Sequence, residues 1–342
     1  MAASHSAPKR VNLAFQGGGS HGAFTWGVAD RLLQEPRIEI EGICGASAGA
    51  MNAAVLGSGY AKGGRVGARE ALAAFWGRIG EAGSRSPIQP SWLDQWLGTN
   101  RMDFSPTFLA FDMISRLFSP YELNPANINP LRDVVADSVD FAALREASDI
   151  KLFVCATNVR TGKIKVFENK DLCVEAVLAS ACLPFMFQTV WHEGEPYWDG
   201  GYMGNPALYP LIYNCQSQDV VLVQINPLTR QEVPFGARDI LDRVNEISFN
   251  SSLMREMRAV HFVSQLVEAG RLPADEFRDL YIHIVESEDV LNKLGASTKL
   301  NATKPFLQHL FETGQNAAER WLTAHFDALG QRSSVDVAGI FL

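Results

Sequence analysis

The sequence predicts an α/β fold built around a largely parallel sheet. Apolar segments of strand length alternate with segments of helical periodicity, and they lie at residues 11–16, 38–44, 151–158, 220–226 and 279–285. This alternation is typical of units in which a helix connects two parallel strands. The 342 residues, 47% of them hydrophobic, are enough for one large core or for a core with a smaller appendage.

Charge and the N-terminal segment bear on partners and location. The formal net charge of -8 argues against a nucleic-acid partner and against purely electrostatic attachment to anionic lipid, so we expect any membrane contact to be apolar. Residues 1–10 lack the apolar region of a signal peptide, and no apolar stretch reaches transmembrane length. The five cysteines are expected to be buried free thiols. We therefore predict a cytoplasmic protein with peripheral, transient membrane contact.

A glycine-flanked serine lies in the segment Gly45-Ala46-Ser47-Ala48-Gly49, between the apolar run 38–44 and an alanine-rich helical stretch. Strand, tight turn and helix thus occur in the order of a nucleophile elbow, and Ser47 is the candidate nucleophile. Gly45 and Gly49 fit this interpretation because a side chain there would collide with the adjoining strand and helix. Taken alone, the motif is equally compatible with a chance turn of small residues.

A glycine-rich loop, Gln16-Gly17-Gly18-Gly19-Ser20-His21-Gly22, joins the first predicted strand to a helical pattern. Successive glycines can turn their amide N–H groups into a concave anion-binding nest. A phosphate loop is the alternative, but the lysine of a P-loop is missing and the glycine spacing is not that of a dinucleotide-binding fingerprint. With a candidate elbow one strand-helix-strand unit later, we favour an oxyanion hole made by Gly17, Gly18 and Gly19.

A predicted hairpin at residues 189–198 leads into Asp199-Gly200-Gly201. An aspartate at a strand end suits a general base beside a serine, and Gly200 and Gly201 would let a second backbone approach. In isolation, a residue that ends a hairpin in an Asx-turn is the more common explanation. Together with the serine and glycine motifs, the sequence favours Asp199 as a general base.

Four sequence blocks make the chain resemble the patatin-like phospholipase family. They occur in family order between residues 9 and 226, and they are Leu13-Ala14-Phe15-Gln16-Gly17-Gly18-Gly19-Ser20-His21-Gly22-Ala23-Phe24, Gly45-Ala46-Ser47-Ala48-Gly49, Ala179-Ser180-Ala181-Cys182-Leu183-Pro184-Phe185, and Asp199-Gly200-Gly201 with Asn205-Pro206-Ala207. The resemblance implies a three-layer patatin-like fold over residues 9–230, with a mainly parallel central sheet flanked by helices. The chain departs from the family at His21, where many members carry Arg or Lys, and an imidazolium would replace that charge in part.

By that resemblance, the mechanism is a Ser47–Asp199 dyad without histidine. Asp199 would take the proton of Ser47 as the hydroxyl attacks an ester carbonyl, and the amides of Gly17 to Gly19 would hold the tetrahedral oxyanion. Water activated by the same carboxylate would then release the fatty acid. Burial against Trp198 and Tyr202 would raise the pKa of Asp199 toward the working pH. No metal and no cofactor is required.

Several alternatives stay open at the level of sequence. His261, His283, His309 and His325 follow Asp199, so the Ser, Asp, His order of a hydrolase triad is formally available, although only two strands precede Ser47. The resemblance favours a lipid acyl hydrolase acting on phospholipid or lysophospholipid. An acyltransferase or an intracellular polyester depolymerase would use the same Ser47, and a lipid-binding scaffold would not be catalytic.

Two further segments complete the predicted organisation. Residues 84–130 carry many large apolar side chains, which predicts two short helices packed on the sheet, a lid or acyl-chain wall at the active site, or both. Residues 231–342 are expected to form a mostly helical region packed on the core, with helical patterns at 239–260 and 304–326. Within it, residues 238–250 resemble a C-terminal region of unassigned role in bacterial patatin-like proteins, which predicts helical cover for one sheet edge or a homodimer surface.

Overall fold

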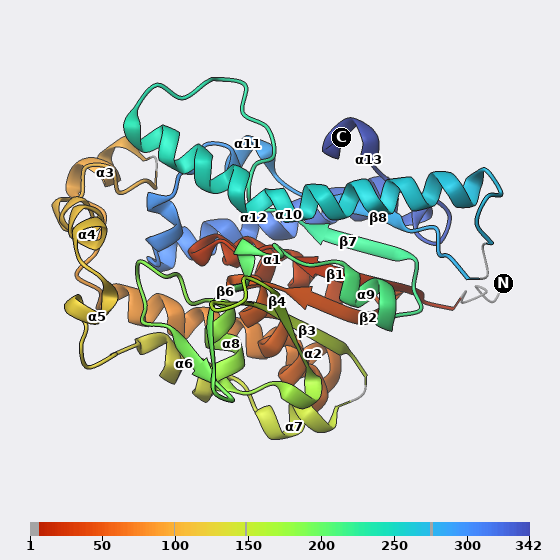
Figure 1. The fold of residues 1–342 in the computed structure, drawn as a ribbon, viewed down its shortest axis with the longest axis horizontal. Helices are drawn as coiled ribbons and strands as arrows, with labels where there is room; N and C mark the ends of the chain where they lie inside the picture. Colours follow the sequence, from red (N-terminus) through yellow and green to blue (C-terminus); the bar gives the residue numbers. More distant parts are fainter. Residues whose placement is uncertain (1–6, 99, 148, 274–275) are drawn as a thin grey trace.

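A mainly parallel, eight-stranded sheet forms the centre of the molecule (Figure 1). The structure is a computed structural model, and it describes residues 7–98, 100–147, 149–273 and 276–342. The strand order is β5-β6-β3-β2-β1-β7-β8, with β4 also paired to β3. The parallel strands are β1 (Lys9–Phe15), β2 (Ile38–Gly45), β3 (Lys151–Asn158), β7 (Asp219–Val223) and β8 (Tyr281–Val285). The antiparallel strands are β4 (Ile164–Glu168), β5 (Val190–His192) and β6 (Glu195–Asp199).

The two faces of the sheet carry separate apolar clusters, which makes the fold three-layered. In β1, Leu13 and Phe15 belong to one cluster and Ala14 to the other, as expected when successive side chains point to opposite faces. The same alternation occurs in β7. The strands are buried on both sides, as parallel strands between helices must be. The predicted fold class is therefore confirmed, and all five predicted strands are present.

Helices cover both faces of this sheet. The helices α1 (Gly22–Gln34), α2 (Ala48–Ser84) and α12 (Lys304–His325) share the larger apolar cluster, whereas α9 (Tyr209–Asn214), α10 (Ala237–Glu268) and α13 (Val337–Phe341) contribute to the smaller one. In Figure 1, α10 and α2 accordingly lie on opposite sides of the sheet. The shorter helices are α6 (Pro130–Ser138), α7 (Phe141–Glu146), α8 (Val174–Ser180) and α11 (Glu288–Leu291).

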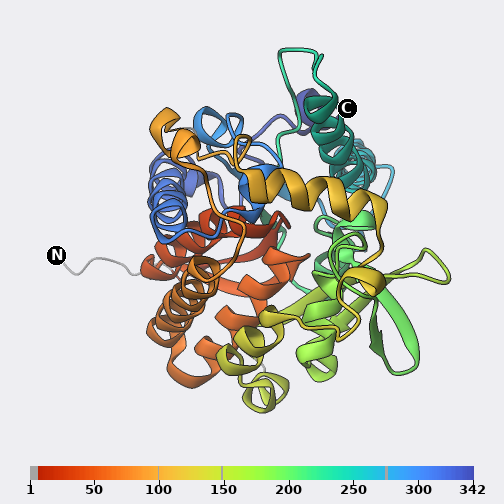
Figure 2. The same ribbon diagram turned by 90° about the vertical axis from the view of Figure 1, so that its left-hand side faces the viewer.

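The helices of residues 84–130 do not pack on the sheet, so the expectation that they would cover it is wrong. They form α3 (Trp92–Leu97), α4 (Pro106–Leu117) and α5 (Pro120–Leu123), which stand at one end of the molecule (Figures 1 and 2). Capping defines them locally: Ser105 begins α4 and Ser119 begins α5 in a capping box with Glu122. The apolar side chains of these helices therefore do not serve to bury the strands.

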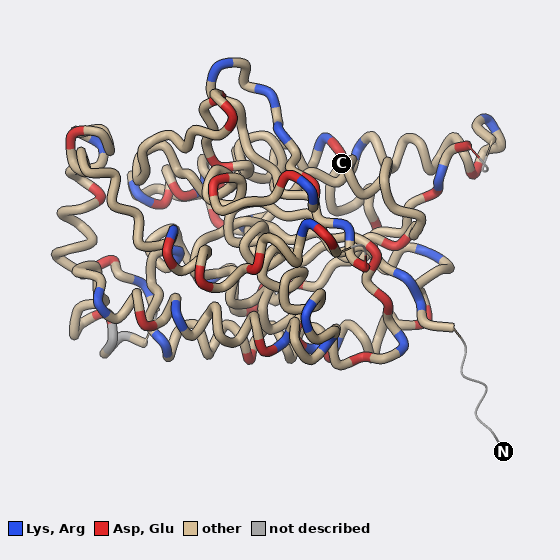
Figure 3. Tube along the Cα trace, turned by 90° about the horizontal axis from the view of Figure 1, so that it is seen from below, with Lys and Arg blue, Asp and Glu red and all other residues tan. Residues whose placement is uncertain are grey.

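The C-terminal residues are built into the core. Strand β8 pairs in parallel with β7, and α12 packs along α1. That helix pair is close because Gly27 and Gly314 leave no room for a side chain between the two backbones. Acidic and basic residues are interspersed along the trace (Figure 3), and no helix of the described residues is both long and apolar enough to cross a membrane.

Candidate active site

Ser47 lies on a strained turn between β2 and α2. The strand ends at Gly45 and the helix begins at Ala48, so the predicted strand, turn and helix are present. Ser47 itself has φ 54° and ψ -123°, a left-handed conformation that costs a non-glycine residue energy. Its amide donates to both the carbonyl and the hydroxyl oxygen of Ser180, at 3.1 and 3.0 Å. These bonds hold the turn in its strained form.

The flanking glycines are required by close packing. A Cβ atom on Gly45 would lie 2.6 Å from the carbonyl of Gly49, and one on Gly49 would overlap the backbone of Phe15. The turn therefore fits between β1 and its own helix only with hydrogen at both positions. The positive φ is at Ser47 rather than at either glycine.

Asp199 ends β6 and is fully buried. Its Oδ1 accepts a hydrogen bond of 2.7 Å from the amide of Gly201, while its Oδ2 has no partner among the described residues. The backbone of Gly200 abuts the carbonyl of Cys155, and Gly201 lies against the ring of Phe249, so neither position has space for a side chain. The carboxylate thus presents one free oxygen.

Burial raises the pKa of Asp199 to about 6. The Gly201 amide, the nearby Ser47 hydroxyl and the charge of Lys299 oppose that increase. The hydroxyl is thus a neighbour of the carboxylate, although the two form no full hydrogen bond, which is common before substrate binds. Tyr202 lines the cavity together with Asp199, and Trp198 is not among the lining residues.

One segment positions both side chains. At the end of α8, Ser180 accepts the amide of Ser47, and two residues later the carbonyl of Cys182 accepts the amide of Asp199 at 2.8 Å. The block 179–185 that carries the resemblance therefore connects the elbow to the strand end. Nothing in its composition indicated this function.

The glycine loop is held from two sides by asparagines. The amide of Gly17 donates to Asn205 Oδ1 at 2.6 Å, and the carbonyl of Gly17 accepts from Asn226 Nδ2 at 2.7 Å. The amides of Gly18 and Gly19 make no hydrogen bond within the described part of the chain. The expected oxyanion hole therefore needs a correction: the Gly17 N–H is already engaged, which leaves Gly18 and Gly19 as free donors.

His21 is neutral in this environment. Burial, and secondarily the charge of Lys299, hold its pKa well below the ordinary value of a histidine. Its Nε2 lies 2.7 Å from Thr298 Oγ1, whose own proton goes to the carbonyl of Gly295, so Nε2 carries the imidazole proton. The expected imidazolium beside the oxyanion is therefore absent.

Lys299 supplies the positive charge that His21 does not. It lies in the 3-10 helix η4 (Ser297–Leu300), next to Gly19 of the glycine loop. Its Nζ donates to Asn226 Oδ1 at 2.8 Å, and its side chain lines the same cavity as Ser47 and Asp199. No sequence motif marks this lysine, since it reaches the site from 252 residues beyond Ser47 (299 − 47).

A cavity of about 310 Å³ joins these groups. Ser47, Asp199 and the glycines 17 to 19 are among its lining residues. Its apolar lining comes from five stretches of the chain: Phe108, Phe111, Leu183, Phe185, Met186, Ile225, Phe249, Leu291, Leu294 and Leu300. Polar side chains also line it, among them Asp112, Ser115, Asp242, Asn245 and Glu246. Such a volume and lining suit a small apolar ligand with one reactive polar group.

The histidines of the alternative triad lie away from this cavity. His261, His283, His309 and His325 are not among its lining residues, and His283 instead pairs with the buried Asp219 at 2.9 Å. Among the described residues, His21 is the one histidine at the cavity wall.

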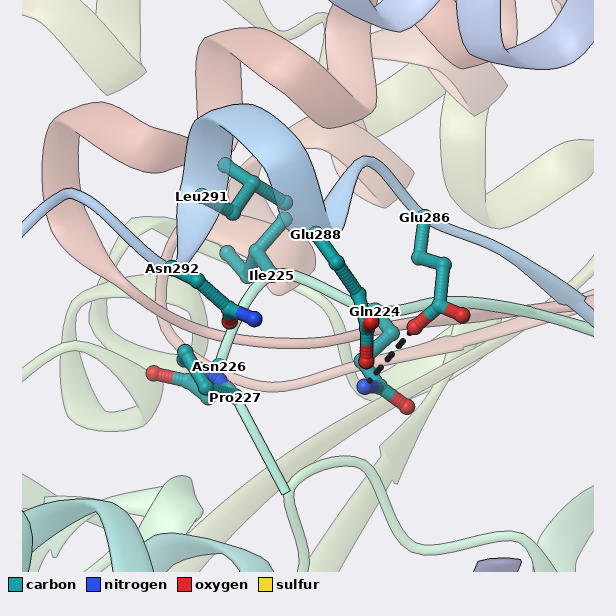
Figure 4. A pocket seen from close by; sticks show the side chains of 8 residues that line it. All are labelled: Gln224, Ile225, Asn226, Pro227, Glu286, Glu288, Leu291 and Asn292. Carbon is teal, nitrogen blue, oxygen red and sulfur yellow. Dashed lines mark hydrogen bonds between the residues drawn. The ribbon is translucent and has the colours of Figure 1, made fainter. Parts of the chain in front are cut away.

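A second, much smaller hollow lies behind the loop after β7 (Figure 4). Its volume is about 10 Å³, about enough for one water molecule. There, Gln224 Nε2 donates to Glu286 at 3.1 Å. The hollow shares Ile225, Pro227 and Leu291 with the main cavity, so these residues form the wall between the two.

A serine elbow and a glycine loop at the carboxyl ends of parallel strands are features of α/β acyl hydrolases. The sequence model of the patatin-like phospholipase family matches residues 13–212. The chain belongs to this family, whose members are lipid acyl hydrolases. A solved structure of VipD from Legionella pneumophila is similar at 15% sequence identity and a TM-score of 0.41, over 94% of this chain and 68% of that one. No curated protein matches the chain.

Proposed function

We propose that this protein cleaves carboxylic esters of phospholipids or lysophospholipids through a dyad of Ser47 and Asp199. One observation carries the proposal: a strained serine and a buried carboxylate with a free oxygen line the same cavity. Strain and an unpartnered buried polar atom both cost stability, and both are typical of functional sites.

The chemistry proceeds in two acyl-transfer steps. Asp199 accepts the proton of Ser47 as the hydroxyl oxygen attacks the ester carbonyl, and the amides of Gly18 and Gly19 stabilise the oxyanion. Collapse of this intermediate breaks the ester bond, and the proton passes from Asp199 to the leaving alcohol. Water, deprotonated by the same carboxylate, then attacks the acyl-serine. The bond from the acyl carbon to Ser47 Oγ breaks, Asp199 returns the proton to that oxygen, and the fatty acid is released. With a pKa of about 6, the carboxylate is mostly ionised at neutral pH.

A lipid acyl chain fits the apolar walls of the cavity. Helix α4 contributes Phe108 and Phe111 to those walls. Its neighbouring stripe, Leu109, Met113 and Leu117, is exposed by 39, 59 and 70%. We therefore propose that α4 serves both as an acyl-chain wall and as a transient, apolar contact with a lipid surface.

The replacement Ser47→Ala tests the proposed chemistry. We expect hydrolysis of p-nitrophenyl esters and of phospholipid to fall to background while the melting temperature is retained, because Ser47 is the hydroxyl at the elbow. A fluorophosphonate should label Ser47 in the wild type and not in the variant, as read by peptide mass spectrometry. Turnover that survives in the variant would contradict the assignment.

The same assay separates the other uses of the serine. Products are analysed with and without added alcohol or lysophospholipid acceptors. Free fatty acid as the main product in both conditions supports a hydrolase, whereas transfer to the acceptor would indicate an acyltransferase. Release of hydroxy acids from a polyester, with phospholipid left intact, would indicate a depolymerase.

A further inference from the structure

A chain of hydrogen bonds connects the C-terminal region to the peptide that faces the active-site cavity. Lys299 Nζ donates to Asn226 Oδ1 at 2.8 Å, and Asn226 Nδ2 donates to the carbonyl of Gly17 at 2.7 Å. Asn226 is buried, and its Nδ2 also lies 3.3 Å from Gln16 Oε1. Because Lys299 can only donate while Gly17 O and Gln16 Oε1 can only accept, the orientation of the Asn226 amide is fixed.

The carbonyl of Gly17, at which this series of hydrogen bonds ends, belongs to the same peptide unit as the Gly18 N–H. In a trans peptide the carbonyl and the N–H point in opposite directions. A carbonyl of Gly17 bound to Asn226 therefore directs the Gly18 N–H away from Asn226. The Gly18 amide has no partner in the described structure, and Gly18 lines the cavity with Ser47.

We propose that Lys299 is a positioning residue for ester hydrolysis: through Asn226, it orients and polarises the Gly17–Gly18 peptide, so that Gly18 becomes a stronger donor to the oxyanion. Hydrogen bonds in series polarise one another, and those that begin at a charged donor are stronger than neutral ones. The inference rests on the proposed function, and it gives residues beyond 230 a part in the chemistry of Ser47.

The surroundings of Lys299 keep its side chain in this place. Asp242 of α10 accepts the amide of Ala296 at 3.0 Å, and Ser297 donates to Asp103 at 3.0 Å, so two hydrogen bonds hold the start of η4. Burial lowers the pKa of Lys299, and the carboxylates of Glu246, Asp242 and Asp199 oppose that effect. Arg230 repels the charge, while the neutral His21 adds none.

A double-mutant cycle with Lys299→Met, Asn226→Ala and the combined variant tests the chain of hydrogen bonds. The measurements are kcat and KM for p-nitrophenyl butyrate, with melting temperature as the control for folding. Loss of an oxyanion donor lowers kcat by about 10²–10³, and Lys299→Met leaves the donor in place, so we expect a smaller loss of about tenfold or more with little change in KM. The double variant should be no slower than Asn226→Ala alone, because both remove the same connection.

A transition-state analogue separates this role from a structural one. An alkyl trifluoromethyl ketone forms a tetrahedral adduct with the serine, so its inhibition constant should weaken in Lys299→Met by the same factor as kcat. The corresponding unreactive alkyl alcohol should bind as it does to the wild type. Lys299→Arg, which keeps a charged donor, should recover part of the rate.

The pH profile gives an independent readout. Lys299 lowers the pKa of Asp199, so Lys299→Met should move the acid limb of kcat/KM to higher pH. A higher KM with unchanged kcat, or multiplicative effects in the double variant, would overturn the proposal. Failure of the proposed function would look different, because wild-type turnover would then be insensitive to Ser47→Ala.

Discussion

Asp199, the proposed general base, has an environment that costs stability. Its carboxyl group is fully buried, one oxygen is unpartnered, and burial raises the pKa to about 6. In the unfolded chain the same group ionises near pH 4. Between these two values folding takes up a proton, so stability falls as the pH rises through this window and is constant above it.

The variant Asp199→Asn should therefore lose activity and gain relative stability. We expect kcat to fall by about 10² or more, since the positioned proton acceptor is gone. Relative to the wild type, the free energy of unfolding of the variant should increase by about 2–3 kcal/mol between pH 4 and pH 8. Denaturant unfolding at the two pH values measures this. A constant difference would show that the buried carboxylate carries no such shift.

The residues of the site differ in how far the sequence could predict them. Ser47 and Asp199 each lie in a short local motif, and the combination of these motifs with the glycine loop was what selected them. Lys299 and Asn226 carry no motif, because their role depends on contacts that only the folded chain makes. The engagement of the Gly17 amide was missed for the same reason, since Asn205 lies 188 residues away.

At the scale of elements, α4 has two apolar stripes with different surroundings. Phe108 and Phe111 face the cavity, while Leu109, Met113 and Leu117 recur every fourth residue on the exposed side. Apolar periodicity predicted the helix, but periodicity does not say which surface covers an apolar stripe. The buried strands were simpler to predict, because a short run that is apolar on both faces fits a central strand.

Polar substitution of the exposed stripe should affect lipid surfaces alone. The triple variant Leu109→Gln, Met113→Gln, Leu117→Gln should bind phosphatidylcholine vesicles at least about tenfold more weakly, because three apolar side chains no longer insert. Vesicle sedimentation and phospholipid hydrolysis measure the loss, while hydrolysis of p-nitrophenyl butyrate should stay at the wild-type rate.

Val66→Gln is the matched control for this variant, because Val66 is also an exposed apolar helix residue, at 61%, but lies on α2. It should bind vesicles as the wild type does. Equal loss in both proteins, or no loss in the triple variant, would remove α4 from the lipid contact. Since the stripe is apolar, the binding should also depend little on ionic strength.

At the scale of the whole molecule, the C-terminal residues join the core and the site at once. Strand β8 extends the sheet, α12 covers α1, and α10 brings Phe249 against Gly201. The family match ends at residue 212, yet Lys299 and Phe249 line the same cavity as Ser47. The sequence pattern changes near residue 230, but residues on the two sides of this boundary pack against one another.

A chain that ends at residue 230 should therefore not fold into an active enzyme. It would expose the edge of β7 and the face of α1 that packs on α12, including Trp26, whose ring contacts that of Phe311. Exposed strand edges and large apolar patches favour aggregation. We expect an insoluble product without a cooperative melting transition, and recovery of solubility and esterase activity when residues 231–342 are co-expressed as a second chain.

Cleavage of the full-length protein at a protease site placed within residues 231–236 controls for chain breakage, and should leave activity intact because both parts are already packed together. Cooperative melting and wild-type turnover by residues 1–230 alone would show that the family region, residues 13–212, is self-sufficient and that Lys299 has no part in catalysis.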